Sequence, residues 1–291
     1  MAVKVGRRSW GVRILAIVWV IVLAGCSGSA AISARPSQLV AVTSNDPKTF
    51  NCALVQELPT VGGFICEGLI FENGQGQIEP DLAESWTVSD DKRTVVFTLR
   101  SDLKWSDGHP LTAEDVVFSY RDVYLNPKLS VPAQDSFKIG PTGAFPTVRK
   151  LDDRRVEFKL PEPFAPFIRS TGGGGGAGAA ILPAHKLRDA VNTLDSRGQS
   201  TFLATWGTDT DPTAVIVNGP YRIASYSPSQ RVVFERNPFY WRKDAQGRSQ
   251  PYIDRIVWQI VQSGDTALIQ FRSGSVDLLG VGPASFSLLK R

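Results

Sequence analysis

The sequence is poor in the residues that build catalytic and metal centres. It holds only three cysteines and two histidines. No Cys-x-x-Cys pair occurs, and His109 and His185 are isolated from each other, so a zinc site is not expected. No Gly-x-Ser-x-Gly segment is present, and no cysteine or serine beside a histidine suggests a nucleophile. We therefore interpret both histidines as structural and expect neither catalysis nor a cofactor.

Glycine is abundant, but its densest run does not have the pattern of a phosphate loop. The run lies at Thr171–Ala180. A phosphate-binding loop needs a strand before its glycines and a Lys-Ser or Lys-Thr pair after them, and both are missing. We interpret this segment as a flexible surface loop.

The long apolar segment near the start of the chain is too short to span a bilayer. Ile14–Leu23 contains ten apolar residues and follows the basic residues of the leader. Leu23-Ala24-Gly25-Cys26 then places small residues before a cysteine, as at a lipoprotein cleavage site. This pattern predicts a lipoprotein signal peptide at 1–25, lipid on Cys26 and a tether at 26–37. An uncleaved signal anchor with a chance cysteine is the alternative, and Arg7-Arg8 is a weak indication of twin-arginine export.

The positive charge of the chain belongs to this leader. The formal net charge is +4, and Lys4, Arg7, Arg8 and Arg13 account for all of it. Removing the leader leaves a neutral exported body without an excess of basic residues. The basic isoelectric point therefore does not indicate a nucleic-acid partner.

Cys52 and Cys66 remain as an even pair in an exported protein. An oxidising compartment permits a short-loop disulfide between them. Two buried free thiols would satisfy the sequence equally well, so both alternatives stay open.

The stretch 79–121 carries the clearest structural pattern. Thr94–Leu99 alternates apolar and polar residues, which predicts a half-buried strand paired with a shorter one at Trp86–Val88. Thr112 is placed to cap a helix, with Asp115 at its third position in a capping-box arrangement. Elsewhere the pattern predicts a strand at 38–43, hairpins at 148–160 and 221–235, a strand at 256–261 and a helix near 267–272.

This stretch contains five linked blocks: Pro80–Trp86, Val88–Asp91, Phe97–Arg100, Lys104–Gly108 and Leu111–Ser119. Together they resemble the signature of family 5 of the bacterial extracytoplasmic solute-binding proteins, which serve peptide, oligopeptide and nickel ABC importers. Asn218–Arg222 and Arg236–Trp241 resemble two further family segments, Gly-Pro-Tyr and Arg-Asn-Pro-x-Tyr-Trp. The resemblance covers residues 38–291.

The resemblance implies an α/β fold, a mixed sheet with β-hairpins and flanking helices. This would be the first lobe of a two-lobed periplasmic-binding-protein fold of type II-like architecture. Family members continue beyond Arg291, so we expect residues 38–291 to supply lobe I and only the start of lobe II. A chain cut in this way is expected to bind peptides weakly or not at all alone.

The function implied is capture of a peptide or another small solute outside the membrane, for delivery to an ABC permease. A non-binding truncated fragment is the alternative, and a periplasmic hydrolase fits less well because its catalytic parts are missing. Peptide, nickel chelate and other small solutes remain open as ligands.

The resemblance also suggests ligand contacts. It places the segment after Phe50 at the edge of the ligand cleft, so Gln56, Glu57 and Leu58 are candidate contacts. The alternative is that they are ordinary loop residues without a role in binding. In family members the loop that corresponds to Asn126–Pro146 often lies over the cleft, so Phe137 in this loop is a fourth candidate contact.

Overall fold

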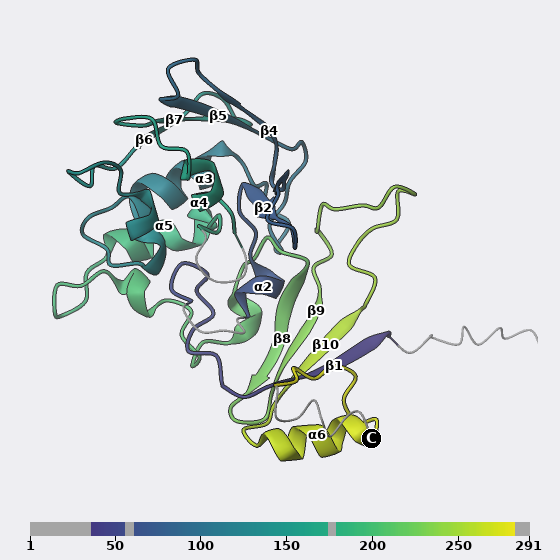
Figure 1. Ribbon diagram of the computed structural model, residues 1–291. Helices are drawn as coiled ribbons and strands as arrows, with labels where there is room; N and C mark the ends of the chain where they lie inside the picture. Colours follow the sequence, from purple (N-terminus) through teal and green to yellow (C-terminus); the bar gives the residue numbers. More distant parts are fainter. Residues whose placement is uncertain (1–35, 56–60, 174–178, 283–291) are drawn as a thin grey trace, which may run out of the picture. The chain divides into compact units, whose positions relative to one another are not determined.

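The computed structural model describes residues 36–55, 61–173 and 179–282. These residues form three β-sheets with short helices packed against them (Figure 1). They belong to one unit that begins at Pro36. The mixed α/β architecture expected from the sequence is confirmed.

The first sheet brings together strands from the two ends of the described chain. Its order is β1 (Gln38–Thr43), β10 (Arg255–Ile260), β9 (Arg231–Arg236) and β8 (Tyr221–Ser227). The β1 and β10 strands are parallel, whereas β10, β9 and β8 are antiparallel neighbours. The predicted hairpin of β8 and β9 is confirmed, and the parallel pairing completes the sheet through a contact distant in sequence.

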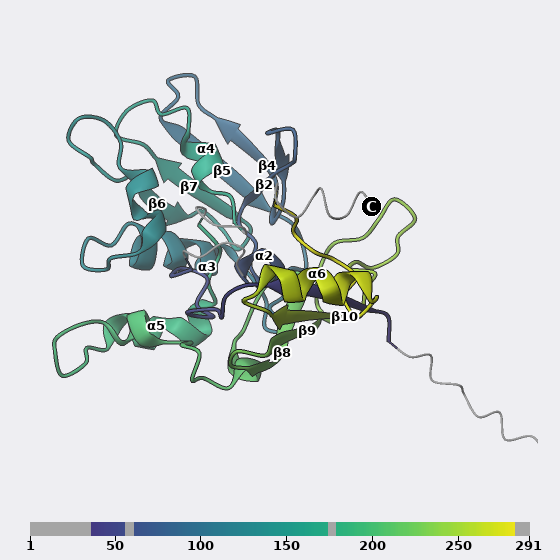
Figure 2. The same cartoon turned by 60° about the horizontal axis from the view of Figure 1, so that its bottom comes forward.

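Two helices pack on this first sheet. The short helix α2 (Gly62–Ile65) places the ring of Phe64 5.1 Å from that of Phe234 and 5.5 Å from that of Trp258. The helix α6 (Gly264–Arg272) follows β10 and lies beside the sheet (Figure 2). Aromatic contacts of this kind add to the burial of apolar area, so α2 is held by packing rather than by its length.

The second sheet is wholly antiparallel. Its order is β4 (Ala83–Val88), β5 (Thr94–Leu99), β7 (Arg155–Lys159) and β6 (Thr147–Lys150). The predicted alternation of β5 is confirmed, because its buried residues are Val95, Phe97 and Leu99. A small third sheet pairs β2 (Ile70–Glu72) with β3 (Ile78–Pro80) and leads the chain from α2 into β4.

The remaining helices are short. They are α3 (Ala113–Val117) and its π-helical continuation Phe118–Tyr124, α4 (Phe167–Ser170), α5 (Ala184–Asn192), and the 3₁₀ turns Pro132–Phe137, Thr201–Ala204 and Pro212–Ala214. The predicted capping box is confirmed at α3. The Thr112 side chain accepts from a backbone N–H of the first turn, and the Asp115 carboxylate accepts from the backbone N–H of Thr112. Across the described ranges, no helix combines the length and the apolar character needed to cross a bilayer.

An aromatic core lies between the second sheet and these helices. Ring centroids are 4.8 Å apart for Tyr120 and Phe158, 5.2 Å for Phe158 and Phe167, and 5.5 Å for Tyr120 and Phe137. All four side chains are almost completely buried. Edge-to-face packing of this kind fixes the helices against the sheet.

Candidate functional site

Most of the predicted ligand contacts lie outside the described residues. This holds for Gln56, Glu57 and Leu58, and also for the predicted lipid attachment site, Cys26. The structure does describe the chain on both sides of the 56–60 segment, where Val55 and Val61 are buried. The candidate contacts therefore stay predictions, while the positions from which the segment starts and to which it returns are fixed.

The chain before this segment is held by hydrogen bonds to a distant part of the sequence. The backbone N–H of Phe50 donates to the carbonyl of Trp206 over 2.8 Å. The side-chain amide of Asn51 donates to the carbonyls of Phe202 and Thr205, each over 3.3 Å. Asn51 is fully buried, so these bonds satisfy a polar group that would otherwise destabilise the fold.

The parts of the chain before and after the 56–60 segment are also joined covalently. The structure places a disulfide between Cys52 and Cys66, with their Cα atoms 6.3 Å apart. This separation lies within the range that a disulfide can bridge without backbone movement. The loop that it closes contains the whole 56–60 segment.

We expect the disulfide to protect both thiols and to stabilise the fold. Thiol alkylation of the exported protein, unfolded in urea without reductant, should leave Cys52 and Cys66 unlabelled, and prior reduction should expose both. Replacing the pair with serine should lower the free energy of unfolding by about 3 kcal/mol, because the unfolded chain regains the entropy of an open loop. Labelling of both residues before reduction would contradict the pairing.

The residue after the second cysteine is a centre of backbone contacts. Glu67 donates its N–H to the side chain of Asn218 over 2.8 Å, and its carbonyl accepts from the N–H of Ile181 over 3.0 Å. The next residue, Gly68, passes so close to Gly173 that a Cβ atom on Gly68 would lie 2.1 Å from the Gly173 nitrogen. The chain here is therefore fixed against both ends of the glycine-rich run, and those ends are packed rather than on a free surface loop.

The side chain of Glu67 takes part in a buried polar cluster. Its Oε1 accepts from the Tyr240 hydroxyl over 2.5 Å, and its Oε2 accepts from the Trp241 indole N–H over 2.8 Å. The nearby carboxylate of Asp81 accepts from the Arg242 guanidinium over 2.8 Å. The two acids are 8% and 3% exposed, so their charges are largely removed from water.

Burial changes the acidity of both carboxyl groups. Burial, and then the neighbouring charge of Asp81, raises the pKa of Glu67 to about 8 despite the hydrogen bonds from Tyr240 and Trp241. Burial likewise raises the pKa of Asp81 to about 6, against the lowering effect of Arg242.

Within the described ranges, no group of three or more His, Cys, Asp or Glu residues could hold a metal ion.

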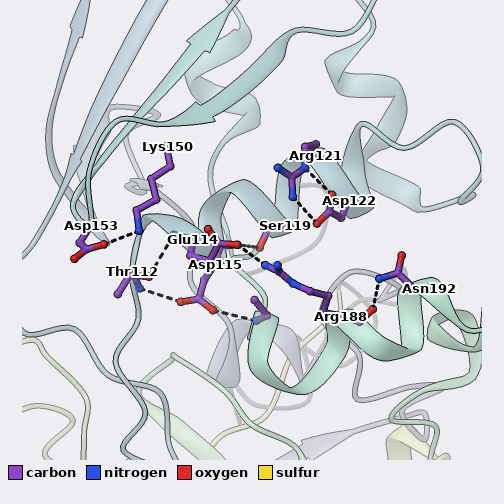
Figure 3. A network of polar contacts seen from close by, with 11 residues as sticks. Thr112, Glu114, Asp115, Ser119, Arg121, Asp122, Lys150, Asp153, Arg188 and Asn192 are labelled. Atoms are coloured by element: carbon purple, nitrogen blue, oxygen red, sulfur yellow. Dashed lines mark hydrogen bonds and ion pairs between the residues drawn. The ribbon is translucent and has the colours of Figure 1, made fainter.

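A second polar network joins α3 to α5 (Figure 3). Asp115 accepts from the backbone N–H of Thr112 over 2.9 Å and from that of Ala184 over 3.0 Å, so one carboxylate caps two helices. Arg188 pairs with Glu114 over 2.5 Å across the same junction (Figure 3). Since both Asp115 oxygens are already bonded to the backbone, this network is structural.

A cavity of about 540 Å³ opens beside this junction, lined in part by His109, His185 and Asp189. The two imidazole rings stack with centroids 4.1 Å apart. His185 is also bonded through Nε2 to a carboxylate oxygen of Asp107 over 2.9 Å. The fold thus brings together two histidines that the sequence suggested were isolated, and their structural role stays a prediction.

The structure corrects the interpretation of Phe137. The sequence suggested that this side chain, in a loop over the cleft, contacts the solute. Instead it is fully buried, with its ring 5.5 Å from that of Tyr120 and 6.4 Å from that of Phe167. The segment before it forms a 3₁₀ turn that directs the ring into the core. A side chain with no exposed surface offers nothing to a solute, so Phe137 is not retained as a candidate contact.

The sequence interpretation did not identify the Glu67 cluster. Its other members, Asp81, Tyr240, Trp241 and Arg242, come from two segments far apart in the chain. Asp81, Tyr240 and Trp241 lie within blocks that resemble the family, but the resemblance did not assign them a partner. A single acid between apolar neighbours, as in Cys66-Glu67-Gly68-Leu69, was the available signal for a buried carboxyl group.

The fold is the one found in solved structures of extracytoplasmic binding proteins. The chain aligns with AppA of Bacillus subtilis in complex with a nonapeptide at a TM-score of 0.71 and 21% identity, covering 88% of this chain and 47% of AppA. It aligns with MelB of Agrobacterium fabrum in complex with stachyose at a TM-score of 0.72 and 22% identity, covering 87% of this chain and 38% of MelB. These likenesses establish the class of fold and confirm the predicted periplasmic-binding-protein fold, while the division of the chain into lobes stays a prediction.

The sequence then places the chain within that class. Residues 77–291 match the family described as bacterial extracellular solute-binding proteins, family 5 middle. The chain belongs to this family, as its sequence blocks suggested.

Curated relatives are similar over most of this chain but only part of their own length. A probable D,D-dipeptide-binding periplasmic protein, DdpA of Escherichia coli, is 31% identical over 73% of this chain and 36% of its own length. A probable ABC transporter-binding protein of Deinococcus radiodurans is 28% identical over 81% of this chain and 39% of its length. The periplasmic oligopeptide-binding protein OppA of Salmonella typhimurium is 28% identical, with 73% and 37% covered. The chain thus spans less than half the length of these relatives.

Proposed function

We propose that this chain belongs to the solute-binding component of an ABC importer and that its solute is a peptide or a similar small molecule. The observation that carries this proposal is the family match over residues 77–291. The relatives named for a bound solute add support, because OppA and DdpA are named as peptide-binding proteins. The proposed role is capture and delivery, without a catalytic step.

The proposed mechanism uses the main chain of the solute. A peptide in extended conformation presents alternating N–H and C=O groups, which the donors and acceptors of a sheet edge can pair with. Such pairing gives affinity without strict sequence selectivity. In a two-lobed protein, closure of the lobes then removes the solute from water. We propose that the 56–60 segment, through Gln56, Glu57 and Leu58, supplies contacts from this lobe.

We further propose that the protein works on the outer side of the membrane as a lipoprotein. The support is the leader at 1–25 with its basic start, short apolar core and terminal cysteine. Lipid on Cys26 would hold the protein beside its permease while the tether at 26–37 lets it move. The match to an extracellular family agrees with this location.

The proposal predicts peptide binding by the protein isolated from its own membrane. Calorimetric titration with a mixture of short peptides should give heat of binding with a dissociation constant in the micromolar range or tighter, corresponding to about −8 kcal/mol. Nickel–histidine chelate and stachyose serve as matched controls of other solute classes. Binding of a control with no response to peptides would overturn the proposed solute class.

A further inference from the structure

The Glu67 carboxyl group is held by side chains of one loop, the segment 237–242 that follows β9. The Trp241 indole nitrogen can only donate, so Oε2 of Glu67 acts as an acceptor whether the acid is neutral or ionised. The Tyr240 hydroxyl can either donate or accept, so its 2.5 Å contact with Oε1 suits both protonation states. The contacts therefore persist on protonation, and what changes is the charge.

The charges that face Glu67 come from three further positions. Asp81, after β3, adds a negative charge, and the Arg242 guanidinium pairs with that acid over 2.8 Å. Arg100, after β5, donates its Nε–H to the Asp81 carbonyl over 2.6 Å, and its guanidinium carbon lies 4.1 Å from the centre of the Trp241 ring. With both acids ionised, two buried negative charges would face Arg242, and Arg100 would offset only that of Asp81, an arrangement that burial makes costly.

The backbone at this point connects several elements. Glu67 is bonded to Asn218 and to Ile181, and the preceding residue is the disulfide partner Cys66. The Asn237 side chain at the start of the loop donates to the carbonyl of Gly219 over 2.9 Å. The 237–242 loop and the chain that follows the 56–60 segment therefore meet at Glu67, whose side chain is bonded to the loop.

We propose that Glu67, Tyr240 and Trp241 form a proton-controlled clasp, which fastens the 237–242 loop to the 66–68 segment while Glu67 is neutral and loosens when Glu67 ionises. Ionisation places a second negative charge beside Asp81 in a site largely removed from water, and opening relieves this by letting more water reach the carboxylate. The clasp is a property of this lobe and does not depend on the identity of the solute.

The direction of the pH dependence follows from the pKa of Glu67 in the two states. In the closed state the pKa of Glu67 is raised to about 8, whereas a solvated glutamate has its ordinary value of 4.5. Between these values the closed state holds a proton that the open state releases, so the closed state loses stability as the pH rises. Below pH 6 the closed state also holds a proton on Asp81, whose pKa is raised to about 6, so the closed state loses stability with rising pH more steeply there. Between pH 6 and 8 we expect opening to become about tenfold more favourable per pH unit, levelling off above pH 8.

Hydrogen exchange measured by mass spectrometry tests this directly in the full chain. Protection factors, corrected for the intrinsic rise of exchange with pH, would be followed from pH 6 to 9 in peptides covering 61–71 and 237–243. Both peptides should lose about tenfold protection per pH unit up to pH 8. A peptide covering β5 reports opening elsewhere and should show no such slope. Equal slopes in all three peptides, or none in the two clasp peptides, would overturn the proposal.

Glu67→Gln identifies the proton responsible. Glutamine keeps the shape of the neutral acid, with a carbonyl oxygen for Trp241 and an amide N–H for Tyr240, but it cannot ionise. The slope in both clasp peptides should disappear in this variant and remain in the matched control Glu157→Gln, which removes a partly exposed acid paired with Arg149. A slope that persists in Glu67→Gln would assign the proton to another group and overturn the clasp. The wild-type profile remains decisive if Glu67→Gln does not fold.

Discussion

Replacing Gly68 with alanine is expected to lower the free energy of unfolding by about 3 kcal/mol or more, because overpacking against immovable neighbours is among the largest single-residue effects. A Cβ atom at this position would lie 2.1 Å from the nitrogen of Gly173 and 2.6 Å from the carbonyl carbon of Gly172. These are backbone atoms, so no side-chain rotation can relieve the overlap. The two segments would have to separate, with loss of the hydrogen bond from the Leu69 N–H to the Thr171 carbonyl.

Gly63→Ala is the matched control for this prediction. Gly63 lies in the helix α2, and a Cβ atom there would meet nothing within 4 Å. Alanine is favoured over glycine in a helix by about 1 kcal/mol, so this variant should be slightly stabilised. Urea denaturation of both variants, followed by tryptophan fluorescence, measures the difference. Equal stability of Gly68→Ala and wild type would show that the two segments can separate without cost.

The close approach at Gly68 also shows what the glycine-rich pattern could and could not predict. The run lacks a phosphate-loop sequence, so the sequence argued against a nucleotide site, and that part stays a prediction. The interpretation of Thr171–Ala180 as a surface loop was wrong at both described ends, where Thr171 and Ala180 are buried. A glycine needed for backbone approach and one needed for flexibility are identical in sequence, since only the partner segment distinguishes them.

Local elements were predictable because their signals are local. The alternation in β5 and the capping box at Thr112 depend on residues within one turn or one strand, and both are confirmed. The parallel pairing of β1 with β10 depends on where the intervening chain returns. Neither strand contains that information, so the sheet order could be obtained from the family resemblance but not from the alternation of residues.

The candidate site was less predictable than the fold. Phe137 was assigned to the solute on the position of its loop in the family, yet a large aromatic side chain gains more from entering the core. Glu67 was overlooked because a buried acid is recognised only by the groups that satisfy it, and these lie more than a hundred residues away at Tyr240 and Trp241. Polar groups that converge from distant segments are the part of a site that a single sequence conveys least.

Replacing Cys26 with serine is expected to abolish attachment of lipid and processing of the leader. The ten-residue apolar core Ile14–Leu23 is too short to span a bilayer, so on this view the protein depends on lipid for its anchor. Acyl chains anchor through buried methylene groups, and several chains hold a protein stably where one does so only weakly. Serine has no thiol to modify, so the variant should remain an unprocessed precursor without lipid label.

Metabolic labelling with a tagged fatty acid, followed by separation of the membrane and soluble fractions, measures this outcome. Ser29→Ala is the matched control, because it changes a side chain three residues after Cys26 without touching the leader and should keep both the label and the shorter mature length. Continued labelling of Cys26→Ser would defeat the assignment of this cysteine. Loss of the label in both variants would point instead to a defect in export, since a precursor that never reaches the membrane cannot be modified there.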